Sequence, residues 1–279
     1  MGGEIEIIQI RDGDARKTRD VVATEVPLTV FLNDKEVATL LTCDVEFKPL
    51  AVGFLFAEGF LQNKDDLSGL FESTERKVVR VYTEDRREPE TGGSMITSGC
   101  GQGRSYATYN LEAAAVEQKP DSFRVSAKAI SDLMHALQVQ SSLFRKTGGV
   151  HSCALAEPDR IVLFKEDIGR HNAVDRILGT CLLKDIPLED KILLTSGRAS
   201  SEMVFKASRG RVPILVSRSA PTDLAIQIAE QAGITLVGYA RGRRMNIYAH
   251  PERIEEVYTD ERYPNQAGRT RQTTCGAAV

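Results

Sequence analysis

The stretch KILLTSGRASSEMVFKASRGRVPILVS, Lys191–Ser217, alternates between two kinds of hydrophobic pattern. A short apolar strand pattern over 191–195 is followed by a helical pattern over 200–210 and by a second strand pattern over 213–217. Short apolar strands that alternate with helices are typical of a parallel or mixed sheet with helices packed on its faces. This stretch therefore predicts an α/β fold.

The same alternation extends to both sides of the stretch. Upstream, HSCALA and RIVLF read as the two strands of a hairpin, and downstream the chain carries two further strand patterns. Helical spacing of apolar residues accompanies them. The predicted helices cover 126–148, 171–183 and 222–233, and the predicted downstream strands cover 234–240 and 244–249.

The first half of the chain has a different pattern. Strands are predicted over 4–10, 25–32, 33–41 and 76–83, and one helix, apolar nearly all round, is predicted over 46–61. We therefore predict a smaller, strand-rich α+β domain over 1–120 that ends in a polar, glycine-rich segment. The α/β domain is predicted over 121–279, with a polar, loosely ordered tail.

The composition is that of a soluble globular protein: 42% of the residues are hydrophobic and 27% are charged. A formal net charge of −3 favours neither nucleic acid nor an anionic membrane, and no apolar run reaches the ~20 residues of a membrane span. The five cysteines are widely spaced and form no CxxC, which argues against a disulfide framework and a structural zinc site. With no export signal at the start, we expect a cytoplasmic protein with no metal site of its own.

Four polar segments directly follow predicted strands: 165–175, 196–202, 218–223 and 239–244. Ligands of open α/β sheets bind at the carboxyl ends of strands, where free helix N–H groups and arginine side chains hold phosphate. We therefore predict a phosphate-bearing, nucleotide-like ligand over these segments. YARGRR has the strongest signal, with three arginines after a buried strand, and its alternative is a solvated hairpin tip. The candidate residues are Tyr239, Ala240, Arg241, Gly242, Arg243, Arg244, Ser196, Arg198, His171 and Asp175.

His171 and Asp175 are four residues apart and share a helix face. The carboxylate would orient the imidazole or accept hydrogen bonds from a guanine edge. The alternative is an ordinary surface pair.

Cys100 lies between two glycines, with Arg104 nearby. A cysteine reacts as the thiolate, which nearby cations favour, so Cys100 is either a nucleophile or an inert loop residue. Cys43, Cys153 and Cys181 lie in apolar patterns and are expected to pack in the core. Cys275, in the tail, is either inert or a partner thiol.

Other enzyme classes find little support. Neither a zinc-deaminase signature nor a Walker A loop is present. A hydrolase that pairs Cys100 with His151 or His171 stays open, although the sequence shows no third, orienting group.

Five segments carry a family resemblance: PLAVGFLFAEGF, GGVHSCAL, EDIGRHNAVDRILG, SGRASSEMV and LVGYARGRRMNIYAHPERI. Together, in consistent order from about Glu25 to Ile254, they resemble the FdhD family of formate dehydrogenase accessory sulfurtransferases. The resemblance implies a cytidine-deaminase-like mixed sheet flanked by helices. It also implies a cytoplasmic maturation factor that forms a homodimer.

The implied activity is sulfur transfer. Such proteins take persulfide sulfur from a cysteine desulfurase and pass it to the bis(molybdopterin guanine dinucleotide) cofactor of molybdenum or tungsten, which formate dehydrogenase requires. Carried over by residue, the persulfide falls on Cys100 and the cofactor-binding segment on 239–244. GDP-like nucleotides are expected to occupy the same site.

The chain departs from a pattern that many family members share. They carry CxxC in the cysteine loop, whereas here the second position is Gly103. A lone Cys100 can carry a persulfide but cannot form the local disulfide. The alternative function is therefore a chaperone that binds the guanine dinucleotide cofactor without transferring sulfur.

Overall fold

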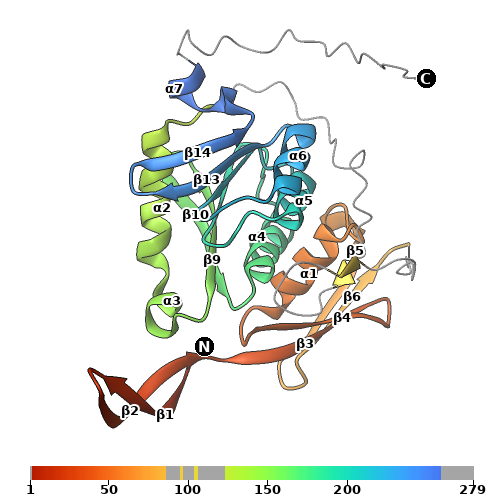
Figure 1. The fold of residues 1–279 in the computed structure, drawn as a ribbon. Helices are drawn as coiled ribbons and strands as arrows, with labels where there is room; N and C mark the ends of the chain where they lie inside the picture. The colour runs from red at the N-terminus through yellow and green to blue at the C-terminus, as the bar shows by residue number, and fades with distance from the viewer. Residues whose placement is uncertain (1, 86–94, 97–103, 106–122, 259–279) are drawn as a thin grey trace, which may run out of the picture.

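The computed structural model describes residues 2–85, 95–96, 104–105 and 123–258. The larger part of the fold is a six-stranded mixed sheet in the order β10-β9-β11-β12-β13-β14 (Figure 1). Strands β11, β12 and β13 run parallel, and the remaining neighbours pair antiparallel. The strands are β9 (His151–Glu157), β10 (Arg160–Asp167), β11 (Ile192–Thr195), β12 (Ile214–Ser217), β13 (Thr235–Arg241) and β14 (Arg244–Ala249). The predicted α/β sheet flanked by helices is confirmed.

Helices cover both faces of this sheet. Alternate residues of each strand face opposite sides, so Leu193 and Leu215 join one hydrophobic cluster while Leu194 and Val216 join the other. The second cluster holds the apolar side of α2 (Ala127–Gln140). The first cluster holds the apolar sides of α4 (Arg170–Lys184), α5 (Ser201–Arg209) and α6 (Asp223–Ala232), and it extends into the N-terminal half of the chain.

The N-terminal half contributes a four-stranded sheet in the order β4-β3-β6-β5, and helix α1 (Phe47–Ala57). The strands are β3 (Glu25–Leu32), β4 (Lys35–Cys43), β5 (Leu67–Ser73) and β6 (Val78–Thr83). A separate hairpin of β1 (Gly2–Arg11) and β2 (Asp14–Ala23) projects from this end of the molecule (Figure 1). The predicted domain boundary at residue 120 lies outside the described residues.

Helix α1 packs against α4 and joins the two halves. The helices meet at two glycines, where a Cβ on Gly53 would lie 1.8 Å from the Asp175 carbonyl oxygen and one on Gly179 would lie 1.9 Å from the Pro49 carbonyl oxygen. Any larger residue at either position would force the backbones apart. The main hydrophobic cluster accordingly runs from the N-terminal strands through α1 to α4.

One predicted helix is two helices in the structure. The sequence predicts a continuous helix over 126–148, whereas α2 ends at Gln140 and α3 (Ser142–Thr147) follows. Ser141 lies at the break, where its Oγ donates to the Leu137 carbonyl at 2.7 Å and lies 2.7 Å from Ser152 Oγ. A serine hydroxyl that bonds to nearby backbone competes with helix continuation. The helix predicted over 46–61 also ends earlier, at Ala57. No helix among the described residues is long and apolar enough to cross a membrane.

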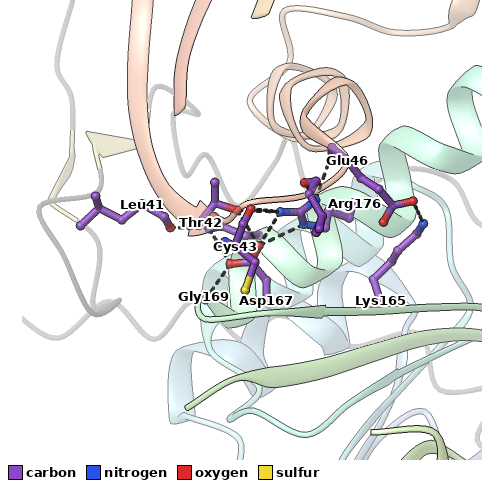
Figure 2. Close-up of polar contacts among 10 residues, drawn as sticks. Leu41, Thr42, Cys43, Glu46, Lys165, Asp167, Gly169 and Arg176 are labelled. Atoms are coloured by element: carbon purple, nitrogen blue, oxygen red, sulfur yellow. Dashed lines mark hydrogen bonds and ion pairs between the residues drawn. The ribbon is translucent and has the colours of Figure 1, made fainter. Parts of the chain in front are cut away.

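A buried ion pair between Asp167, at the end of β10, and Arg176, in α4, lies beside the end of β4 (Figure 2). Arg176 donates to Asp167 Oδ2 from Nε at 3.0 Å and from Nη2 at 2.8 Å, and both side chains are fully buried. Arg176 also donates to the carbonyls of Val45, Glu46 and Cys43. Its partners therefore span both halves of the chain.

Both oxygens of the Asp167 carboxylate accept further hydrogen bonds besides those from Arg176 (Figure 2). Thr42 Oγ1 donates to Oδ2 at 2.5 Å, while the Gly169 amide and Asn172 Nδ2 donate to Oδ1 at 2.9 and 3.0 Å. Thus the same carboxylate binds β4 and holds the turn from β10 into α4.

Arg176→Met should lower the free energy of unfolding by about 3–5 kcal/mol, because it leaves the Asp167 carboxylate buried without its cation. Urea denaturation followed by circular dichroism measures the change. Lys128→Met, on the exposed face of α2 in a surface pair with Asp132, is the control and should change stability by less than about 0.5 kcal/mol. A loss below about 1 kcal/mol for Arg176→Met would contradict the role given to this pair.

Candidate functional site

The carboxyl ends of four strands meet at one edge of the large sheet. Because β9 is antiparallel to both β10 and β11, strands β10, β11, β12 and β13 all end at this edge. We call it the strand-end edge. Strand β9 begins here with His151, and β14 begins here with Arg244. The topology confirms that the four polar segments predicted from the sequence lie at the same edge.

Ser196 and His151 form the centre of this edge. The Oγ of Ser196 accepts from the Ser152 amide at 2.9 Å and lies 3.3 Å from His151 Nδ1. Burial, followed by the charges of Arg170, His171 and Arg198, lowers the pKa of His151 below its ordinary value of 6.5. The imidazole is therefore neutral near pH 7, mainly because it is buried, with Arg170 and Arg198 acting in the same direction.

His171 and Asp175 have separate partners on α5, so the predicted interaction between them is replaced by two helix-to-helix contacts. His171 Nε2 lies 2.6 Å from Glu202 Oε2, and Lys206 Nζ donates to Asp175 Oδ1 at 2.6 Å. Burial raises the pKa of Asp175, although Lys206 acts against it. Burial also acts to lower the pKa of Lys206, but the nearby carboxylates outweigh it and the pKa is raised. Asp175 is thus a buried contact between α4 and α5.

The segment 239–244 forms the hairpin between β13 and β14. Arg241 pairs with Arg244 in the ladder, and Gly242 at the tip has a φ of +57°, which suits glycine. The hairpin tip considered as the alternative is the geometry that the chain adopts. The arginines 241, 243 and 244 are exposed there, whereas Ala240 is buried and offers a ligand only its backbone.

Tyr239 has a strained backbone at the end of β13. Its φ is +51°, a left-handed value that is rare for an aromatic residue, and it lies at a register irregularity of the β13–β14 ladder. Its ring is 38% exposed, with the Arg241 guanidinium carbon 5.9 Å from the ring centroid. Arg241 Nε also donates to the Arg218 carbonyl at 2.8 Å. Strain of this kind is found where a side chain must be held in one direction.

Two polar residues at this edge were not singled out from the sequence. Ser200, the N-cap of α5, is 3% exposed, and within the described residues neither its Oγ nor Arg218 Nε has a hydrogen-bond partner. A buried polar atom without a partner costs about 1–3 kcal/mol, which a ligand would recover. Both lie inside the predicted segments 196–202 and 218–223. The signal that identifies them is burial, which appears only in the folded chain.

The strand-end edge has the chemistry of an anion site. Arg170 and Arg198 lie close enough to His151 to act on its pKa, and Arg241 contacts the Arg218 backbone, whereas the acidic groups Asp167 and Glu202 are bound by Arg176 and His171. In the described part of the chain, no group of three or more His, Cys, Asp or Glu side chains is arranged to hold a metal ion.

The cysteines divide into two groups. Cys43, Cys153 and Cys181 are buried free thiols, as predicted, and burial raises the pKa of Cys181 to about 12. Such thiols are poor nucleophiles. Cys100 and Cys275 lie outside the described residues, so the role predicted for Cys100 stays a prediction.

Comparison with known proteins gives a consistent result. The model of the FdhD/NarQ family matches residues 23–255. The chain is 39% identical to the sulfur carrier protein FdhD of Halalkalibacterium halodurans over 253 residues, which cover 89% of this chain and 94% of that protein. It is 40% identical to the Bacillus pumilus protein of the same name, with 90% and 96% covered.

A solved structure agrees with the model. A putative formate dehydrogenase accessory protein from Desulfotalea psychrophila superposes with a TM-score of 0.76 at 28% sequence identity, covering 91% of this chain and 99% of that one. The matched fold, the extent of the family match and the sequence identity lead to one conclusion. The chain belongs to the FdhD/NarQ family.

Proposed function

We propose that this protein is a sulfur carrier in the maturation of formate dehydrogenase, with Cys100 as the residue that holds the sulfur. Membership of the FdhD/NarQ family supports the carrier role, since its relatives bear the name sulfur carrier protein FdhD. The proposal also includes a bound phosphate-bearing ligand, and the observation that supports this part is the strand-end edge. Four strands end there among arginines and two buried polar atoms, Ser200 Oγ and Arg218 Nε, which have no hydrogen-bond partner in the described part of the chain.

The proposed first step moves one sulfur atom between two thiols. The Cys100 thiolate attacks the terminal sulfur of a persulfide on a cysteine desulfurase. The new S–S bond forms on Cys100 as the old one breaks, and the desulfurase cysteine leaves as a thiolate, so no external oxidant or reductant is needed. A single cysteine suffices for this exchange, which accommodates Gly103 in place of a second thiol.

The proposed acceptor is the bis(molybdopterin guanine dinucleotide) cofactor of molybdenum or tungsten, bound here as a substrate. Its phosphates are anions that Arg198, Arg218 and the arginines of 239–244 would bind, and the buried Ser200 hydroxyl would donate to a phosphate oxygen at the start of α5. The exposed Tyr239 ring offers a stacking surface for guanine. We further propose that the protein works in the cytoplasm as a homodimer.

Cys100→Ala should abolish the persulfide adduct that forms when the natural chain is incubated with a cysteine desulfurase and cysteine. The physical reason is that Cys43, Cys153 and Cys181 are buried and cannot reach the donor. Intact-protein mass spectrometry detects the added sulfur atom, and Cys275→Ala, which should keep the adduct, is the matched control. An undiminished adduct on Cys100→Ala would rule out its role, whereas no adduct on the natural chain would favour the cofactor-binding chaperone.

Arg241→Ala and Arg244→Ala should each weaken GDP binding about tenfold or more in calorimetry, because each removes a charge-assisted contact to phosphate. Added salt should reduce the difference between the natural chain and these variants. The control is Lys128→Ala on α2, which packs on the other face of the sheet from α4, α5 and α6. It removes one positive charge and should leave the affinity for GDP unchanged. If all three variants bound GDP like the natural chain, the hairpin would have no part in phosphate binding.

GDP binding should tighten more in the natural chain than in His151→Gln as the pH falls below 6.5. His151 is neutral in the free protein because burial and neighbouring cations lower its pKa, and a bound phosphate would favour the imidazolium. Binding therefore takes up a proton, and affinity rises as pH falls. Titrations across this pH range measure the difference, and titration of the nucleotide itself is common to both chains. Parallel pH profiles would show that no phosphate lies near His151.

A further inference from the structure

A pocket lies at the end of the large sheet opposite to the strand-end edge. It has a volume of about 660 Å³, within the usual range for small-molecule sites. Its walls are the ends of α1, α4 and α5 and the segment 62–64. Helices α4 and α5 both begin at the strand-end edge and finish at this pocket, so the two sites are separated by the length of a helix and share no residue.

The floor of this pocket is apolar. Phe56, Leu178 and Leu188 are buried in the main hydrophobic cluster, and Leu182 and Ile186 are half-buried beside them. Cys181 also lines the wall, but burial raises the pKa of its thiol to about 12, so it contributes surface and no reactivity. Leu182 and Ile186 are thus the side chains of this floor that have apolar surface open to the hydrocarbon body of a ligand.

Arg211 holds an unusual backbone conformation at the rim. Its φ is +55°, a left-handed value that glycine adopts without cost and that is unfavourable for a residue with a Cβ. The neighbouring Gly210 has a φ of −76°, and a Cβ added there would lie 3.0 Å from Leu178 Cδ2 and 3.1 Å from Leu188 Cδ1. A side chain at 210 would thus press on two leucines, while the backbone at 211 would favour glycine and carries an arginine.

Five charged residues line the pocket: Lys64, Asp185, Glu189, Arg209 and Arg211, and Glu189 Oε2 accepts from the Leu188 amide at 3.2 Å. Lys64 and Asp185 form an ion pair with each other. Arg209 Nε donates to the Phe56 carbonyl at 3.3 Å, and its guanidinium fits only because Gly59 has no Cβ, which would lie 2.2 Å from Nη2. Arg209 is therefore held at the end of α1. Arg211 is exposed and, within the described residues, forms no ion pair.

We infer that this pocket binds an organic anion, a carboxylate attached to an apolar body. The floor holds the body, and the Arg211 guanidinium binds the carboxylate in a bidentate arrangement. This assignment explains why the chain keeps an arginine at a position where its backbone favours glycine. The ordinary alternative is a surface cation that complements the negative end of α5. The two explanations predict different effects of Arg211→Gly. A ligand-binding arginine would be needed for binding and not for stability, whereas a cation that complements the end of α5 would be needed for stability and not for binding.

The test is a calorimetric titration of the full chain with 4-phenylbutyrate and, in parallel, with its uncharged analogue 4-phenylbutanamide. The carboxylate should bind saturably, and the amide about tenfold or more weakly, because it lacks the charge that Arg211 recognises. Arg211→Gly should weaken the carboxylate by a similar factor. The same variant should melt at or above the temperature of the natural chain, because glycine relieves the left-handed backbone.

Two controls locate the binding. Lys17→Gln removes an exposed cation on the β1–β2 hairpin and should leave 4-phenylbutyrate binding unchanged. Arg241→Ala, at the strand-end edge, should also leave it unchanged. The inference fails if 4-phenylbutyrate does not saturate, if the amide binds equally well, or if Arg241→Ala weakens binding while Arg211→Gly does not. It also fails if Arg211→Gly lowers the melting temperature, which would show a structural role for the arginine.

Discussion

The buried contact between Arg176 and Asp167 is the interaction on which the arrangement of this protein depends. One carboxylate accepts from Arg176 and Thr42 through Oδ2, and from Gly169 and Asn172 through Oδ1. The first pair of contacts holds the N-terminal sheet against α4, and the second holds the turn that carries Arg170 and His171 into the strand-end edge. A buried ion pair of this kind adds less stability than its charges suggest, because both ions lose their hydration. Its geometric consequence is a direct link between the two halves, since Arg176 also donates to Thr42 Oγ1 and to the Cys43 carbonyl at the end of β4.

Helices α4 and α5 connect the two edges of the sheet. At the strand-end edge they are joined through His171 with Glu202 and through Asp175 with Lys206, and at the far end they enclose the apolar pocket below Arg211. Exposed arginines lie at both ends of this helical layer, Arg241 and Arg244 at the strand-end edge and Arg211 at the pocket, where the carboxylates of Asp185 and Glu189 also line the wall. The two proposed ligands differ accordingly: phosphates at the polar strand-end edge, and an apolar carboxylate at the pocket beside Arg211.

Most of the fold could be predicted from hydrophobic periodicity. Runs such as ILLT and ILVS are buried on both faces, and their composition shows it. The four strand-end segments followed from the order of strands and helices alone. Ser200 and Arg218 could not be identified in this way, because a serine or arginine in a polar loop looks the same whether its side chain reaches solvent or a buried cavity. The partners of His171 and Asp175 were also out of reach, since helix spacing predicts contacts within a helix and these two cross to α5.

By itself, the sequence determined the α/β class, the core cysteines, the family, and the polar segments that follow the strands, because these depend on residue type and on spacing along the chain. Only the tertiary structure decided which polar groups are buried without partners, which helices pair through Asp175 and Lys206, and where the left-handed backbones of Tyr239 and Arg211 lie. Those features depend on contacts between residues far apart in the chain. Their energies come from desolvation and close packing, which exist only once the segments have been brought together.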